Sequence, residues 1–193
     1  VEPSVADKER AKKEAENILV TLTPENFKDK AKEYSAGPSA ENGGELGWFS
    51  KGDMVEPFQK AVFEGKVGEV YPTPVETVFG YHLILIEDRK DEENRAKASH
   101  ILFTPTLSEE TTSAKAKEID ELKSKLQNNE ISFKDLTKDR KDVIQSNTFK
   151  INNAGYISGL GYNDVLAKTI LDAPSNKVES FTAEDKIYIF NKV

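Results

Sequence analysis

Cysteine is absent from this chain of 193 residues, histidine occurs twice, and tryptophan and methionine occur once each. Without cysteine the chain forms no disulfide, and thiolate catalysis and cysteine-based metal sites are excluded. The sequence also lacks HExxH, Walker A, GxSxG and a GxGxxG followed by an acidic residue, the motifs of zinc proteases, nucleotide-binding proteins and serine hydrolases. We therefore expect neither a metal ion nor another cofactor.

Long apolar runs are also missing, because the longest, Tyr81 to Ile86, has only the length of a β-strand. No segment is long enough to span a bilayer, and the first residues do not resemble a signal peptide. The net charge is -7, and no cluster of basic residues is interleaved with aromatic ones. These features argue against nucleic acid as a partner.

Among the features that are present, residues 43–58 stand out, because this stretch is rich in glycine and holds the only tryptophan and the only methionine. Glycine adopts backbone conformations closed to other residues and lets a second chain approach closely. Large apolar side chains beside such a backbone form either a corner of the core or an apolar binding pocket.

Periodicity and turn residues predict the secondary structure. Apolar residues at helical spacing predict helices over residues 4–22, 27–34, 56–63, 108–126, 132–136 and 164–171. Short apolar runs between turns predict strands over residues 75–78, 81–87, 98–103 and 186–193, in addition to one within 43–58. The pattern is typical of an α+β protein.

The two halves of the chain resemble each other, which indicates a repeat of domain size. Residues 26–29 match 132–135, and residues 46–50 match 154–158. Between the halves, seven of the eight residues from Asp88 to Arg95 are charged, which is typical of a solvated linker. We therefore predict two tandem α+β domains, residues 1–88 and 97–193, joined by a charged linker at residues 89–96.

The halves differ at their beginnings. The second half starts with the strand at residues 98–103 and continues into a long helix, whereas the first half starts almost at its helix. We therefore expect the first domain to lack its opening strand, which would lie upstream of Val1 or come from elsewhere. Without that strand, its sheet would have an unpaired edge.

Four linked motifs of the first half, at residues 27–35, 38–49, 54–58 and 79–82, resemble the parvulin (PpiC-like) family of peptidyl-prolyl cis-trans isomerases found in bacterial foldases. The second half resembles the family at residues 98–102 and then departs from it. The resemblance implies two parvulin-like domains, each a small antiparallel sheet with flanking helices, of which the second is a degenerate copy.

The family's site residues fall on definite positions of this chain. The resemblance implies a proline cradle at Leu46, Phe49, Met54 and Phe58, and catalytic roles for His82 and Thr77. A second family histidine belongs on the opening strand, so the first domain would lack it, and His100 would be a structural residue of the second domain. Gly37, or Ala36 if the loop is shifted, stands where the family usually has Cys or Asp, which implies reduced activity.

Judged without the family, the cradle residues would be ordinary core, and His82 would be a buried histidine with satisfied hydrogen bonds. With the family, we predict a prolyl isomerase acting on X-Pro bonds of unfolded or secreted client proteins, with activity in the first domain only. Its partners would be proline-containing extended polypeptides in the bacterial cell envelope, and any association with the membrane would go through parts outside this sequence. The alternative is a chaperone or scaffold that binds unfolded clients without catalysis.

Overall fold

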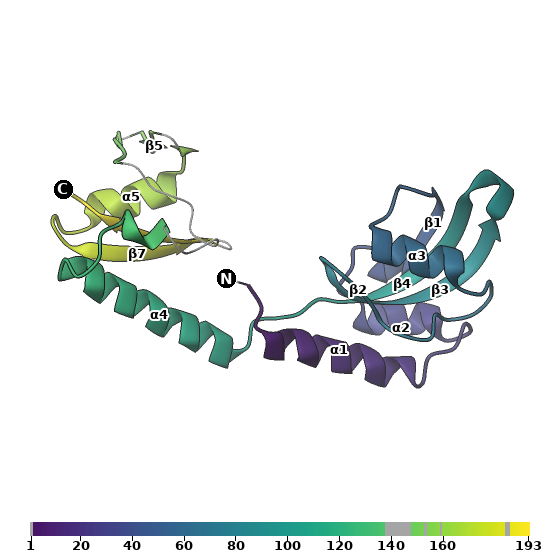
Figure 1. Ribbon diagram of the computed structural model, residues 1–193. Coiled ribbons are helices and arrows are strands. Elements are labelled where there is room, and N and C mark those ends of the chain that lie inside the picture. Colours follow the sequence, from purple (N-terminus) through teal and green to yellow (C-terminus); the bar gives the residue numbers. More distant parts are fainter. Residues whose placement is uncertain (1, 138–147, 153, 159, 184–185) are drawn as a thin grey trace. The chain divides into compact units, whose positions relative to one another are not determined.

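The computed structural model describes residues 2–137, 148–152, 154–158, 160–183 and 186–193. The chain divides into two compact units, Glu2–Ser108 and Glu109–Val193 (Figure 1). The mixed helix and sheet content confirms the predicted α+β class. The boundary between the units, however, lies after Ser108, and the predicted linker at residues 89–96 is part of a β-hairpin in the first unit.

The first unit contains one antiparallel sheet of four strands in the order β1-β4-β3-β2. Its strands are β1 (Glu45–Ser50), β2 (Val75–Thr77), β3 (Gly80–Lys90) and β4 (Arg95–Phe103). A 3-10 turn, η2 (Asp91–Glu93), and Asn94 in the left-handed conformation connect β3 to β4. The charged residues therefore form a tight turn that returns the chain along β3.

Strand β4 corrects the prediction that residues 98–103 open the second domain. The first domain was expected to take a strand from upstream of Val1 or from elsewhere, and β4 supplies one from elsewhere in the chain. β4 lies between β1 and β3, and is paired with β3 along its length and with β1 over residues 95–99. Ala96 and Ala98 contribute to the core on one face of the sheet, and Ile101 and Phe103 to the core on the other. All four are almost completely buried, as expected for a central strand covered on both faces.

Helices cover both faces of this sheet (Figure 1). Helices α1 (Val5–Leu19) and α2 (Phe27–Tyr34) pack on the face of Leu83 and Ile101, and α3 (Glu56–Glu64) packs on the face of Ile84 and Ile86. Pro57 lies in the first turn of α3, where its missing N–H leaves no hydrogen bond unmade. The short helix η1 (Ala40–Asn42) leads into β1.

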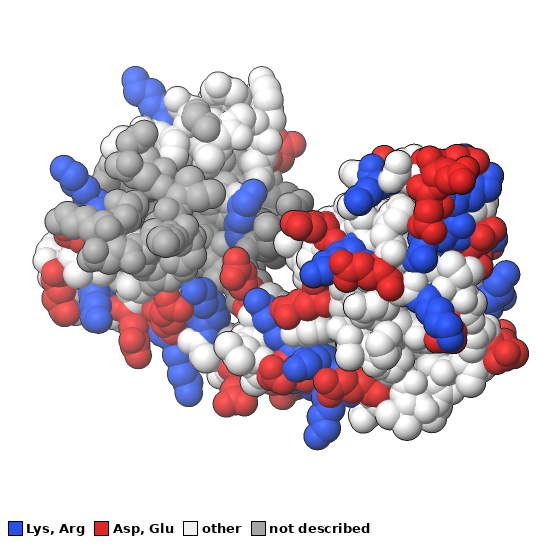
Figure 2. All heavy atoms as spheres, turned by 45° about the vertical axis from the view of Figure 1, so that its right-hand side comes forward, with Lys and Arg blue, Asp and Glu red and all other residues white. Residues whose placement is uncertain are grey.

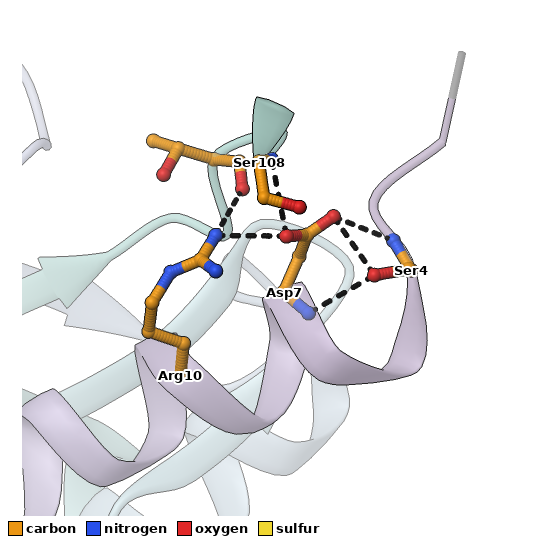
Figure 3. A network of polar contacts seen from close by, with 5 residues as sticks. Ser4, Asp7, Arg10 and Ser108 are labelled. Carbon is orange, nitrogen blue, oxygen red and sulfur yellow. Dashed lines mark hydrogen bonds and ion pairs between the residues drawn. The ribbon is translucent and has the colours of Figure 1, made fainter. Parts of the chain in front are cut away.

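A buried carboxylate ties the segment after β4 to the start of α1 (Figure 3). Asp7 accepts hydrogen bonds from the backbone N–H and the hydroxyl of Ser4 at 3.0 and 2.9 Å, and from the N–H of Ser108 at 3.1 Å. Arg10 donates to Asp7 at 2.8 Å and to the carbonyl of Thr106 at 2.9 Å. Because the carboxylate has four donors, its burial is compensated, and it fixes the exit of β4.

The second unit has the helices α4 (Glu109–Gln127) and α5 (Asp164–Asp172) and the 3-10 turn η3 (Asp135–Thr137). Its described strands form two pairs, β5 (Tyr156–Ile157) with β6 (Gly161–Tyr162), and β7 (Val178–Ala183) with β8 (Lys186–Asn191). Ile157, Leu166 and Ala167 form its buried core. The helix predicted at 132–136 is only the 3-10 turn. No helix in the described part of the chain is long and apolar enough to cross a membrane.

The position of β4 can be tested with Ile101→Ala, because Ile101 is fully buried. Truncating such a side chain costs roughly 2–5 kcal/mol of unfolding free energy. Trp48, the only tryptophan, pairs with Lys97 of β4, so its fluorescence follows the unfolding of the first unit. We expect this transition to shift to lower urea concentration. Val78→Ala, at an exposed position, is the control, and an unchanged Trp48 transition in Ile101→Ala would place β4 elsewhere.

Candidate active site

Two histidines meet on the α3 face of the sheet. His82 on β3 is paired with Leu102, and His100 on β4 is paired with Ile84, so the two histidines are diagonal neighbours on one face. Their Nδ1 atoms are 3.0 Å apart, and the rings are stacked with an interplanar angle of 17°. Only 4% of His82 and 8% of His100 is exposed. His100 is therefore the partner of His82 in the first unit, and the assignment of His100 to the second domain is wrong.

Two hydroxyl groups extend the histidine pair at both ends. Thr77 Oγ1 lies 2.8 Å from His82 Nε2 and also accepts the N–H of Phe79 at 3.1 Å. Ser39 Oγ lies 3.0 Å from His100 Nε2. The result is a continuous chain of hydrogen bonds that runs from β2 to the loop before η1.

The direction of this chain is set by the protons. A hydrogen bond between two Nδ1 atoms requires one ring to donate its proton and the other to offer its lone pair. The ring that donates at Nδ1 has a lone pair at Nε2, and the ring that accepts at Nδ1 has its proton at Nε2. A hydroxyl group can donate to the first Nε2 or accept from the second. The same atoms thus support either of two directions without a buried charge.

Burial keeps both imidazoles neutral. Desolvation, followed by repulsion from His100, lowers the pKa of His82 from 6.5 to about 4. Desolvation also lowers the pKa of His100. Protonating either ring would remove a lone pair that the chain of hydrogen bonds uses, so the geometry and the charge state favour the same neutral form.

Large apolar side chains cover the histidines. The Phe58 ring on α3 meets both imidazoles edge-on, with centroids 5.3 Å from His82 and 5.8 Å from His100. The Phe49 ring lies 6.4 Å from that of Phe58. Leu46 and Met54 are partly buried against the same core. The structure therefore brings the four predicted cradle residues together, next to His82 and Thr77.

Ser39 was not predicted as a partner of His100, because the order of residues in a loop does not show which strand the loop contacts. Gly37 belongs to the same loop, and a Cβ atom at Gly37 would lie 3.4 Å from His100 Nε2. Gly43 and Gly44 have φ angles of 71° and 79°. A Cβ atom at Gly44 would lie 2.2 Å from the carbonyl oxygen of His100. Only glycine fits there, which explains part of the glycine-rich motif.

Comparison with known proteins gives the family of this unit. Residues 2–90 match the family model of the PPIC-type PPIase domain. The first unit carries a parvulin-type domain. The match ends at Lys90, before β4, so the matched residues contain His82 and the cradle, whereas His100 lies outside them.

Three relatives show how far the similarity extends. Foldase protein PrsA of Halalkalibacterium halodurans is 51% identical over 79 residues, which are 40% of this chain and 23% of that protein. Foldase protein PrsA of Bacillus subtilis is 50% identical over 88 residues, covering 45% and 28% of the two chains. Chaperone SurA of Chromobacterium violaceum is 45% identical over 67 residues, covering 35% and 15%. The chain thus matches less than a third of the length of these relatives.

The neutral histidine pair predicts a loss of stability in acid. In the unfolded chain His82 titrates near 6.5, and in the folded chain near 4, so between these values the unfolded state binds more protons. The contribution of His82, roughly 3 kcal/mol, is complete above pH 6.5 and is lost as the pH falls toward 4.

Urea unfolding followed at Trp48 between pH 7.5 and 4.5 measures this loss, and His82→Gln, which keeps hydrogen-bonding capacity but cannot titrate, should flatten the profile. With only two histidines in the chain, NMR titration of the imidazoles assigns both pKa values directly. A value for His82 at or above 6.5 would contradict the prediction.

The position of Gly37 allows a test of the electrostatics around His100. Gly37→Asp would place a carboxylate near His100 Nε2, and an adjacent negative charge favours the imidazolium. We expect the pKa of His100 to rise relative to the wild type, measured by the same NMR titration. Gly37→Asn has almost the same shape without the charge and should leave the pKa nearly unchanged. Equal values in the two variants would show that the loop does not face His100.

Proposed function

We propose that the first unit catalyses cis-trans isomerisation of X-Pro peptide bonds. The observation that carries the proposal is the buried, neutral pair of His82 and His100, hydrogen-bonded to Thr77 and Ser39 at its two ends and covered by Phe58. Membership of the unit in the PPIC-type family supports the same reaction.

The reaction requires no nucleophile and no cofactor, because the barrier of roughly 20 kcal/mol comes from amide resonance. An enzyme lowers it by removing water from the amide and by offering hydrogen bonds that favour the twisted state. In this proposal, Leu46, Met54 and Phe58 hold the proline ring, and their apolar surface excludes water from the bond. The histidine chain lies beneath, where a hydroxyl group at one of its ends stabilises the reoriented amide.

The two directions of the hydrogen-bond chain suit this task. As the X-Pro bond rotates, its carbonyl oxygen and nitrogen change position relative to a fixed donor. A chain that reverses by shifting its protons offers a donor at either end, Thr77 or Ser39, without creating a buried charge. We propose catalytic roles for His82 and Thr77, as the sequence predicted, and add His100 and Ser39.

The clients we propose are unfolded or extended polypeptides that contain proline, as in the predicted foldase. The relatives named foldase protein PrsA and chaperone SurA support this client class. We also propose the bacterial cell envelope as the location, in keeping with the absence of cysteine.

For the second unit we propose a degenerate copy of the same domain. Its order of elements supports this, because a long helix, a short strand, a second helix and a final hairpin (α4, β5, α5 and β7-β8) follow one another as α1, β1, α3 and β2-β3 do in the first unit. Neither of the two histidines belongs to it. It would space or hold clients without catalysis.

A second candidate function for the first unit is chaperone activity without catalysis. Gly37 favours it, because this position next to His100 offers neither an acid nor a thiol. The two functions differ in their dependence on the cradle and the histidines. Suppression of aggregation that survives Met54→Ala and His82→Gln, in a chain without isomerase activity, would favour the chaperone.

The decisive measurement is the isomerisation rate of a short X-Pro peptide, followed by NMR exchange with the full chain. We expect Met54→Ala to lower kcat/KM about tenfold, because a partly buried methionine contributes roughly 1–1.5 kcal/mol of contact with the proline ring. Val20→Ala, at an exposed position on the first unit, is the control and should match the wild type. A wild-type rate equal to the uncatalysed rate would refute the proposed function.

A further inference from the structure

Helix α3 carries Phe58, the side chain that covers both histidines, so the position of α3 decides how well the site is closed. The last turn of α3 contains no basic side chain, and the final carbonyl groups of a helix have no partner within the helix. A donor from another element can bind them, and a positive charge there also stabilises the negative end of the helix dipole. In this unit the donor comes from β3.

Arg89 of β3 supplies both the donor and the charge. Its Nη1 atom donates to the carbonyls of Gly65 at 2.8 Å and Phe63 at 2.9 Å, and more distantly to that of Val62 at 3.4 Å. Its Nε atom makes no hydrogen bond but lies 2.8 Å from Oδ1 of Asp91, an ion pair that orients the guanidinium. Among the described residues, every hydrogen bond that joins the end of α3 to the sheet comes from Arg89.

A β-bulge turns Arg89 toward α3. On β3, Ile86 faces α3, so strict alternation would place Asp88 on that face and Arg89 on the other. The pairing of β3 with β4 shifts between Ile86 and Asp88. After the shift, Arg89 pairs with Ala96, which belongs to the core on the α3 face. Because directly paired residues point to the same face, the bulge aims Arg89 at the end of α3.

Arg89 differs from the charged side chains on the surface of the first unit. On the face shown in Figure 2, basic and acidic side chains are interspersed over this unit, and exposed pairs of this kind contribute little to stability. The Arg89 side chain is only 20% exposed, and its acceptors are backbone carbonyls whose positions are fixed by a helix. Hydrogen bonds from a charged donor in such surroundings are stronger than pairs on the surface.

The link from Arg89 to the site runs through one turn of helix. Val62 follows Phe58 by four residues, so both side chains lie on the same face of α3, and both are buried. The end of α3 is in close contact with the sheet, since a Cβ atom at Gly65 would lie 2.8 Å from Ile86 Cδ1. The guanidinium keeps this end from moving away, and Phe58 then keeps its edge-on contacts with the two imidazoles.

We propose that Arg89 is a positioning residue of the isomerase site, which holds α3 so that Phe58 covers the histidine pair and the proline cradle keeps its shape. The inference rests on the proposed function, because it assigns Arg89 to the same site. Phe58 is both a wall of the cradle and the cover that excludes water from the imidazoles. A displaced α3 would therefore weaken the binding of proline and admit water to His82.

The test replaces Arg89 by Met, which keeps most of the aliphatic stem but has no donor. We expect Arg89→Met to lower kcat/KM for an X-Pro peptide about tenfold, mainly through KM, because a misplaced binding group costs up to about a hundredfold. The NOE between the rings of Phe58 and His82 should weaken, and the pKa of His82 should rise from about 4 toward 6.5 as water reaches the ring. Arg95→Met removes the other arginine of the same hairpin and should match the wild type in all three measurements.

A double-mutant cycle with Phe58→Ala separates positioning from general stability. If Arg89 acts through Phe58, Arg89→Met has no further effect on the pKa of His82 once the ring is gone, and an additive effect refutes the inference. A structural role alone would lower the urea midpoint measured at Trp48 but leave the NOE and the pKa of the folded protein at their wild-type values. That result also refutes the inference.

Two further outcomes keep the test decisive. If Arg89→Met does not fold, Arg89→Lys takes its place, because lysine keeps the charge but its single nitrogen cannot reach the carbonyls and Asp91 together. We then expect the same changes at a smaller size, and an unchanged NOE and pKa refute the inference. If the wild-type chain isomerises no peptide, the proposed function fails, and the NOE and pKa measurements still decide whether Arg89 positions Phe58.

Discussion

The pairing of β4 with both β1 and β3 is the interaction on which the first unit depends. Without β4, β1 would have no strand to join it to β3, and the cores on the two faces would lose Ala96, Ala98, Ile101 and Phe103. The Nδ1 atom of His82 would lose its hydrogen-bond partner in the interior. One strand thus completes the sheet and supplies half of the histidine pair, so folding and the assembly of the site are the same event.

The register of β4 is as important as its presence. Side chains alternate between the two faces of a strand, so a slip by one residue would turn His100 toward α1 and α2 and Ile101 toward His82. The structure holds the register from both ends. The turn at residues 91–94 fixes the start of β4 next to the end of β3, and the Asp7 carboxylate holds the segment that follows β4. Polar contacts far from the histidines thereby position them.

Local patterns predicted most elements of this chain, and the cradle residues are in one cluster as the resemblance implied. Helix α2 has the bounds that its periodicity predicted, and α1, α3, α4 and α5 differ by a few residues at their ends. Local patterns could not predict which sheet β4 joins. The run Ala98 to Phe103 shows that a strand is buried on both faces, but not which sheet buries it, and in a repeat two sheets are equivalent candidates. His100 was assigned to the wrong unit for this reason alone.

Chain connectivity explains which candidate sheet receives the strand. β4 follows β3 after a turn of only a few residues, so their pairing closes a short loop, which costs less entropy than a long one. In the first unit β4 also gains burial on both faces and two flanking strands. The sequence similarity between the two halves reports neither the entropy of loop closure nor the burial of β4. The residues that match the PPIC-type family end at Lys90, and they contain the cradle and His82 but not His100. The matched segment is therefore only part of the site, and the strand after it, which looks like the start of the next repeat, completes the pair of histidines.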